Sequence, residues 1–172
     1  MPVAVDDVPE EGRTFELEAD AETRAAIANM AGLRDLPRLA ATFDVTRQGS
    51  GGLRVAGRVS ATAGQTCVVT LEPLLKSIEE DVDQLFMPQI DPPAPLGDQE
   101  PARTPADVKW NDPEPLIGGV VDLGALVTEF LILGLDPYPR KPGAVFEPPK
   151  EQASDGGPFA ALAGWSKGRN GG

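Results

Sequence analysis

The strongest constraint on the fold is a pair of alternating segments on either side of a glycine-rich turn. In residues 38–46, and again in residues 53–60, apolar and polar side chains alternate. This period of two is typical of β-strands that bury one face. Residues 48–52, Gln-Gly-Ser-Gly-Gly, are typical of a turn, so the two segments predict an antiparallel hairpin. Its outer face carries three arginines, Arg38, Arg54 and Arg58.

Two other segments have helical periodicity. Asp20 is typical of an N-cap and precedes a predicted helix over residues 21–33. Asp122 is typical of the N-cap of a second, more apolar helix, predicted over residues 122–134. The apolar side chains of this helix cover more than half of its circumference. We expect this second helix to be central to the core. On it Glu129 is an isolated acid, for which a structural role is favoured over contact with a partner's arginine.

The remaining segments predict shorter or irregular structure. Phe15–Glu18 alternates as a short strand does, and residues 66–70 and 75–86 predict a further strand pair, although residues 75–86 also fit a helix. Residues 88–115 contain eight prolines and few apolar side chains, and they predict a solvated acidic loop. Residues 139–172 predict an irregular tail rich in Pro and Gly.

Together these segments predict an α+β fold. We expect an antiparallel β-sheet built around the hairpin and packed by the two main helices. The predicted domain spans residues 14–138, between a flexible acidic N-terminus at residues 1–13 and the tail.

The charge of the chain is unevenly distributed. The formal net charge is −12, which argues against general binding to nucleic acid, since such binding depends on Lys and Arg neutralising phosphates. Residues 1–22 and 79–114 hold most of the acids, whereas residues 23–78 have a net charge of +4. The arginines of the hairpin can therefore contact phosphates locally or pair with the chain's own acids, and the acidic segments can hold a basic partner.

The residue types exclude the commonest catalytic and metal sites. The chain has no histidine and one cysteine, Cys67, so histidine-based catalysis, an internal disulfide and the usual zinc sites are not available. Cys67 lies in an apolar run that predicts a buried small hydrophobic side chain. The run Glu79-Glu80-Asp81 is typical of a solvated face, and the glycines at 49–52 lack the Lys-Ser/Thr of a phosphate-binding loop. We expect no enzymatic activity, no cofactor, no metal and no small-molecule substrate.

The sequence also predicts no contact with a membrane. No apolar stretch reaches the eighteen or so residues that a spanning helix needs, and the N-terminus carries acids where a signal peptide carries Lys or Arg. We therefore expect a cytoplasmic protein.

Two motifs resemble the YceD family. The first is Gly64-Gln65-Thr66-Cys67-Val68-Val69-Thr70-Leu71-Glu72-Pro73, and the second runs from Val121 through Glu129 to Leu135-Asp136-Pro137-Tyr138-Pro139. A closing segment, Pro158–Leu162, also resembles the family's tail. The positions that match are Cys67, Glu72, Pro73, Asp122, Glu129 and Pro137. Many relatives have a second cysteine where this chain has Thr70, and a further cysteine pair is missing, so no metal or redox role is carried over.

The resemblance implies a role in ribosome assembly. The family has bacterial and plastid members, is associated with accumulation of the large-subunit (23S) ribosomal RNA, and has no established enzymatic activity. It therefore implies a non-enzymatic factor for large-subunit biogenesis that binds ribosomal RNA or a basic ribosomal protein. Two alternatives remain open: a protein-only adaptor or chaperone that regulates a partner enzyme, and a carboxylate-dependent enzyme for which the sequence shows no arranged site.

Overall fold

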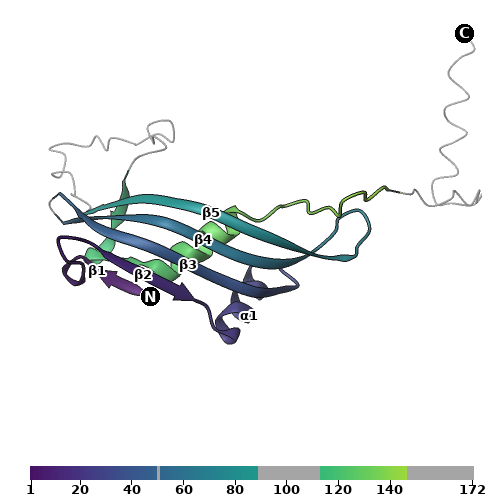
Figure 1. The fold of residues 1–172 in the computed structure, drawn as a ribbon, viewed down its shortest axis with the longest axis horizontal. Helices are drawn as coiled ribbons and strands as arrows, with labels where there is room; N and C mark the ends of the chain where they lie inside the picture. The colour runs from purple at the N-terminus through teal and green to yellow at the C-terminus, as the bar shows by residue number, and fades with distance from the viewer. Residues whose placement is uncertain (50, 89–112, 147–172) are drawn as a thin grey trace, which may run out of the picture.

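A curved β-sheet wrapped around one helix forms the body of the protein (Figure 1). The computed structural model describes residues 1–49, 51–88 and 113–146. Five strands form the main sheet in the order β2-β3-β4-β5-β6, and a two-stranded sheet pairs β1 with β7. The elements are β1 (Pro2–Ala4), β2 (Arg13–Glu18), α1 (Ala21–Met30), β3 (Asp35–Gln48), β4 (Gly52–Thr66), β5 (Pro73–Pro88), β6 (Glu114–Leu116), β7 (Val120–Asp122) and α2 (Leu123–Leu133). The expected α+β class, with an antiparallel sheet and two helices, is confirmed, and among the described strands only β6 pairs in parallel.

The predicted hairpin is confirmed as β3 and β4, which are both longer than the alternating segments. Phe43 lies opposite Gly57, and Val45 lies opposite Val55. The side chains of Phe43, Val45 and Val55 are fully buried. The alternation therefore separates a core face from an outer face, as its period of two requires.

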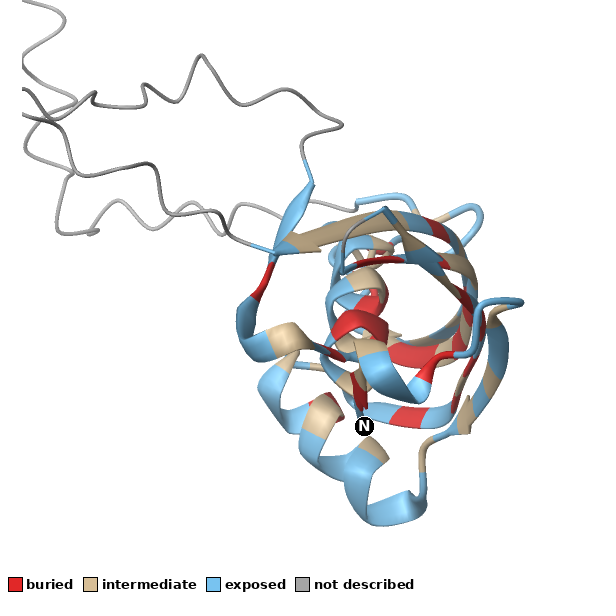
Figure 2. Ribbon diagram, turned by 90° about the vertical axis from the view of Figure 1, so that its left-hand side faces the viewer, coloured by how far each residue is buried: buried red, intermediate tan, exposed pale blue. Residues whose placement is uncertain are grey.

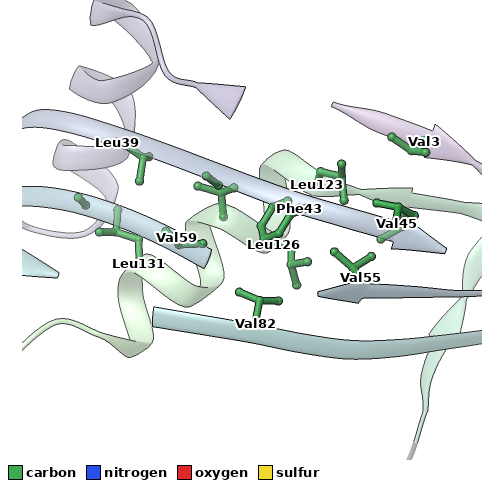
Figure 3. Close-up of a cluster of buried hydrophobic side chains, with 14 of the residues drawn as sticks. Val3, Leu39, Phe43, Val45, Val55, Val59, Val82, Leu123, Leu126 and Leu131 are labelled. Atoms are coloured by element: carbon green, nitrogen blue, oxygen red, sulfur yellow. The ribbon is translucent and has the colours of Figure 1, made fainter. Parts of the chain in front are cut away.

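The sheet curls around α2, so that the inner faces of its strands meet this helix (Figure 2). The buried residues of α2 are Leu123, Leu126, Val127 and Leu131. Figure 3 shows three of them, Leu123, Leu126 and Leu131, among the core side chains of β3, β4 and β5. The Asp122 carboxylate accepts the amide N–H groups of Gly124 at 2.8 Å and Ala125 at 3.1 Å, as an N-cap does. The prediction of a central, capped helix is confirmed. No helix in the described parts of the chain is long and apolar enough to cross a membrane.

Helix α1 lies outside the curl of the sheet and packs against β3 (Figure 2). Its predicted cap is confirmed, since Asp20 Oδ1 accepts the Thr23 amide at 2.7 Å, and this bond lowers the pKa of Asp20. The helix ends at Met30, three residues before the predicted end. Gly32 follows at φ +65°, a conformation that ends helices and favours glycine.

Residues 66–70 do not form the predicted strand. Thr66 ends β4, and the next residues form a turn in which the Leu71 amide donates to the Cys67 carbonyl and the Cys67 amide to the Glu72 carbonyl. Leu71 adopts φ +59°, which a strand does not allow. Beyond the turn, Pro73–Pro88 is one long strand, because it pairs with β4 along nearly its whole length, and this excludes the helix that the sequence also allowed.

Two stretches that were predicted to be irregular contain residues of paired strands in the structure. Residues 1–13 are not a flexible extension, because β1 pairs with β7 and the side chains of Val3 and Val8 are buried in the core. The predicted loop at 88–115 loses both ends, since Pro88 belongs to β5 and Glu114–Leu116 forms β6 beside it. Its interior, residues 89–112, lies outside the described residues, as does most of the predicted tail.

Candidate functional site

The two motifs that resemble one family meet at one end of the sheet, although about 70 residues separate them in sequence. We call this region, residues 65–73 with 136–141, the motif junction. Among the described residues, four hydrogen bonds join its two halves. Gln65 Nε2 donates to the Asp136 carbonyl at 2.9 Å, the Val68 amide to the Pro139 carbonyl at 2.9 Å, the Lys141 amide to Cys67 Sγ at 3.4 Å, and Lys141 Nζ to Glu72 at 2.8 Å. Pro73 begins β5 at its edge, and Pro137 is exposed. The motifs are therefore parts of one structural unit.

Cys67 is the centre of this junction. Its side chain is fully buried, as predicted, but it lies in the turn and not in an apolar strand. Its sulfur accepts hydrogen bonds from the Thr70 and Lys141 amides, both at 3.4 Å. The hydrogen bonds from Thr70, and then the one from Lys141, lower the pKa of Cys67 to about 6, because they favour the thiolate.

Glu72 also links the two halves of the junction. Its Oε2 accepts hydrogen bonds from Lys141 Nζ at 2.8 Å and from the Thr70 hydroxyl at 3.2 Å, and the bond to Lys141 lowers the pKa of Glu72. Thr70, at the position where many relatives have a cysteine, is thus part of a hydrogen-bonded network. Within the described segments, no three His, Cys, Asp or Glu side chains lie close enough to hold a metal ion. The groups present can fasten residues 136–141 to the turn.

We expect replacement of Cys67 by alanine to remove a pH-dependent part of the stability. Because the folded pKa is lowered from 9.0 to about 6, the thiolate stabilises the folded state increasingly from about pH 6 to about pH 9, and this contribution is lost as the pH falls through 6. The free energy of unfolding of the wild-type protein, relative to Cys67→Ala, should therefore rise between pH 6 and pH 9. Urea titrations under reducing conditions measure it. A difference that stays constant with pH would show that the sulfur is a neutral thiol.

Two of the three arginines of the outer sheet face, Arg54 and Arg58, are paired with acids on the neighbouring strand. Arg54 binds Asp83 through two hydrogen bonds of 2.8 Å, and Arg58 binds Asp81 at 2.8 Å with Glu79 at 3.9 Å. These hydrogen bonds raise the pKa of both arginines and lower that of Asp83. Of the two interpretations that the sequence left open, internal pairing therefore describes Arg54 and Arg58.

The outer face as a whole is acidic. The strand register places three arginines on it, Arg38, Arg54 and Arg58, and six acids, Glu16, Glu18, Asp44, Glu79, Asp81 and Asp83. We call these nine residues the outer charged face. Arg38 is exposed and forms no ion pair with the described residues. Strands β3 and β4, which belong to the net-positive stretch at residues 23–78, therefore lie between β2 and β5, which both carry acids on this face.

Asp122 and Glu129 lie at a groove between the two helices. Asp122 caps α2 and also binds the N-terminal amine of Met1 at 2.8 Å, and this hydrogen bond is the main cause of its lowered pKa. Glu129 is exposed about two turns further along α2, beside α1. The periodicity of each helix did not indicate the groove, because it shows which face is apolar but not which helices approach one another.

The comparisons with known proteins agree with the motifs. A family model described as "Large ribosomal RNA subunit accumulation protein YceD" matches residues 55–163, which is more than half of the chain. The search of curated proteins and the search of solved structures each found no significant match. The matched region contains both halves of the motif junction, α2, and the paired arginine Arg58. The chain therefore belongs to the YceD family.

Proposed function

We propose that this protein is a non-enzymatic assembly factor that supports accumulation of the large-subunit ribosomal RNA by holding a basic ribosomal protein. The family description supplies the biological process. The partner is inferred from the outer charged face, where acids outnumber arginines by six to three. Such a face attracts a cationic partner and repels the phosphates of RNA.

The pairing of the arginines favours this partner over direct RNA binding. Asp83 neutralises the charge of Arg54 and Asp81 that of Arg58, so the attraction of both arginines for a phosphate is reduced. A basic ribosomal protein instead meets exposed acids that form no ion pair within the described residues, such as Glu16 and Glu18. Attraction of this kind is long-range and is screened over about 10 Å at 0.1 M salt.

The proposal predicts a selective loss of large subunits in cells that lack the protein. Sucrose gradients of ribosomal particles, with quantification of both ribosomal RNAs, should show fewer large subunits or an accumulation of their precursors, while small subunits stay near their normal amount. Normal large-subunit levels without the protein would rule the proposal out.

Complementation with two matched charge reversals distinguishes the partners. Glu16→Lys and Arg38→Glu both change an exposed outer-face residue that forms no ion pair with the described residues. If the partner is a basic protein, Glu16→Lys should restore large subunits less well than the wild type, and Arg38→Glu should restore them fully. The opposite ranking would indicate that RNA is the ligand.

A protein-only adaptor is the second candidate, and the groove between α1 and α2 favours it, since apolar grooves bind protein segments. It predicts that the protein co-purifies with a non-ribosomal partner after nuclease treatment. Under the assembly proposal, the nuclease-resistant partner is a ribosomal protein of the large subunit.

A further inference from the structure

The groove between α1 and α2 is continuous and apolar. Two adjoining cavities of about 530 and 540 Å³ share Ile27, Ala125 and Thr128, so they form one groove, which we call the α1–α2 groove. At one end three large apolar side chains are exposed: Met30 by 64%, Ile132 by 44% and Leu133 by 69%. A contiguous exposed apolar patch of this kind marks an interaction site more often than an inert surface.

The walls of the groove are acidic. Among the described residues, four carboxylates line it, Glu18, Asp20, Asp122 and Glu129, and no lysine or arginine does. Asp20 and Asp122 are occupied as helix caps. Glu18 and Glu129 are exposed and form no ion pair with other residues of the described segments. An occupant of the groove therefore meets an apolar floor flanked by negative charge.

We propose that the α1–α2 groove binds a basic amphipathic helix of the partner, an inference that rests on the proposed function and adds a second contact surface to the outer charged face. Apolar side chains at positions i, i+3, i+4 and i+7 of such a helix fit a groove floor, and its Lys or Arg residues reach the acids beside it. Glu129, which lines the same end of the groove as Met30, Ile132 and Leu133, pairs with one of these cations.

Two other occupants fit the charge less well. A second copy of this chain brings the same four carboxylates to the groove, and each copy has a formal charge of −12. The chain's own C-terminal segment, residues 147–172, contains the apolar run Phe159–Leu162 but has three acids and three bases, so it offers no net positive charge. A basic partner satisfies both the floor and the walls.

A defined peptide tests the proposal on the full chain. The probe is a fluorescein-labelled peptide of Leu and Lys, about 18 residues or five helical turns long, with all Leu on one face. Its control has the same composition with Leu spread around the helix. Ala125→Trp should fill the groove where its two cavities join, and weaken binding of the probe about tenfold or more. Glu129→Lys should weaken it several-fold, and the effect should shrink at high salt.

Ala26→Trp is the matched control, because Ala26 is exposed on α1 and does not line the groove. It should bind the probe as the wild type does, and urea unfolding verifies that all variants are folded. Equal affinities of Ala125→Trp and Ala26→Trp would overturn the proposal, as would equal binding of the two peptides. Probe binding that tightens about tenfold in Phe159→Ala/Leu162→Ala would overturn it in favour of the tail. A wild-type dimer that Ala125→Trp dissociates would overturn it in favour of a second copy.

Complementation separates this inference from the proposed function. If cells without the protein lose large subunits and Ala125→Trp restores them fully, the groove inference fails while the assembly role stands. If cells without the protein keep normal subunits, the assembly role fails, and the peptide titration still decides whether the groove binds a basic helix. Failure of Ala125→Trp to restore large subunits, with Ala26→Trp restoring them, supports both.

Discussion

Replacement of Phe43 by alanine should lower the free energy of unfolding by about 3–5 kcal/mol, because Phe43 is a fully buried aromatic side chain at the centre of the core. Its ring lies on the inner face of β3, and Figure 3 shows it next to Leu126 of α2. Loss of the ring removes contacts between the sheet and α2 and leaves a cavity that the curved sheet closes only in part. Since small domains are stable by only about 5–15 kcal/mol, this loss is a large share of the total.

Urea unfolding followed by circular dichroism measures the effect. Phe15→Ala is the matched control, because Phe15 lies opposite Phe43 on β2 but is only partly buried, and its loss should cost clearly less. A loss below about 1 kcal/mol for Phe43→Ala would contradict the described core.

Replacement of Gly57 by alanine should destabilise the protein by about 3 kcal/mol, although it adds a single methyl group. A Cβ atom at Gly57 would overlap the Thr42 carbonyl oxygen and come within 2.9 Å of the Phe43 Cα atom. Both atoms belong to the main chain of β3, the paired strand, and cannot rotate away. The two strands must therefore separate to make room for the Cβ atom. The requirement for glycine here is one of space, because Gly57 does not have a positive φ.

The control for Gly57→Ala is Ala56→Thr, one residue away on the outer face of the same strand. Ala56 lies opposite Asp44 and Asp83, where a larger side chain points away from the core. Its effect should stay within about 0.5 kcal/mol. If the midpoints of urea unfolding for the two variants coincide, the close approach of β3 and β4 at Gly57 is not as described.

The elements predicted correctly are those whose signals are local. The β3–β4 hairpin follows from alternation around a glycine-rich turn, and the helix starts follow from Asp20 and Asp122, whose carboxylates cap amides two or three residues ahead. The central position of α2 follows from the apolar side chains that cover more than half of its circumference, since most of such a surface is stable only when it is buried.

The elements predicted wrongly or left open depend on distant partners. Residues 75–86 were predicted as a strand but also fitted a helix, and the pairing of β5 with β4 decides for the strand. The turn at Cys67 depends on residues 136–141, more than 60 positions away. The N-terminal residues are ordered because β1 pairs with β7, nearly 120 residues further along.

The candidate site shows the same division. Its residue types were visible in the sequence, including the acidic segments, Arg54, Arg58 and Glu129. Their partners were not, because the register of β4 against β5 decides that Arg58 faces Asp81, and a slip by one residue would place the acids on the opposite face.

By itself, the sequence determined the residue chemistry and the local structure: an acidic chain without histidine, a hairpin, and two capped helices. It also carried the two motifs of the YceD family. Only the tertiary structure decided that these motifs form one junction, that Arg54 and Arg58 are neutralised by acids, and that α1 and α2 enclose an apolar groove. The physical reason is that propensity, capping and periodicity act over a few residues, whereas strand register and helix packing depend on residues that meet only when the whole chain has folded.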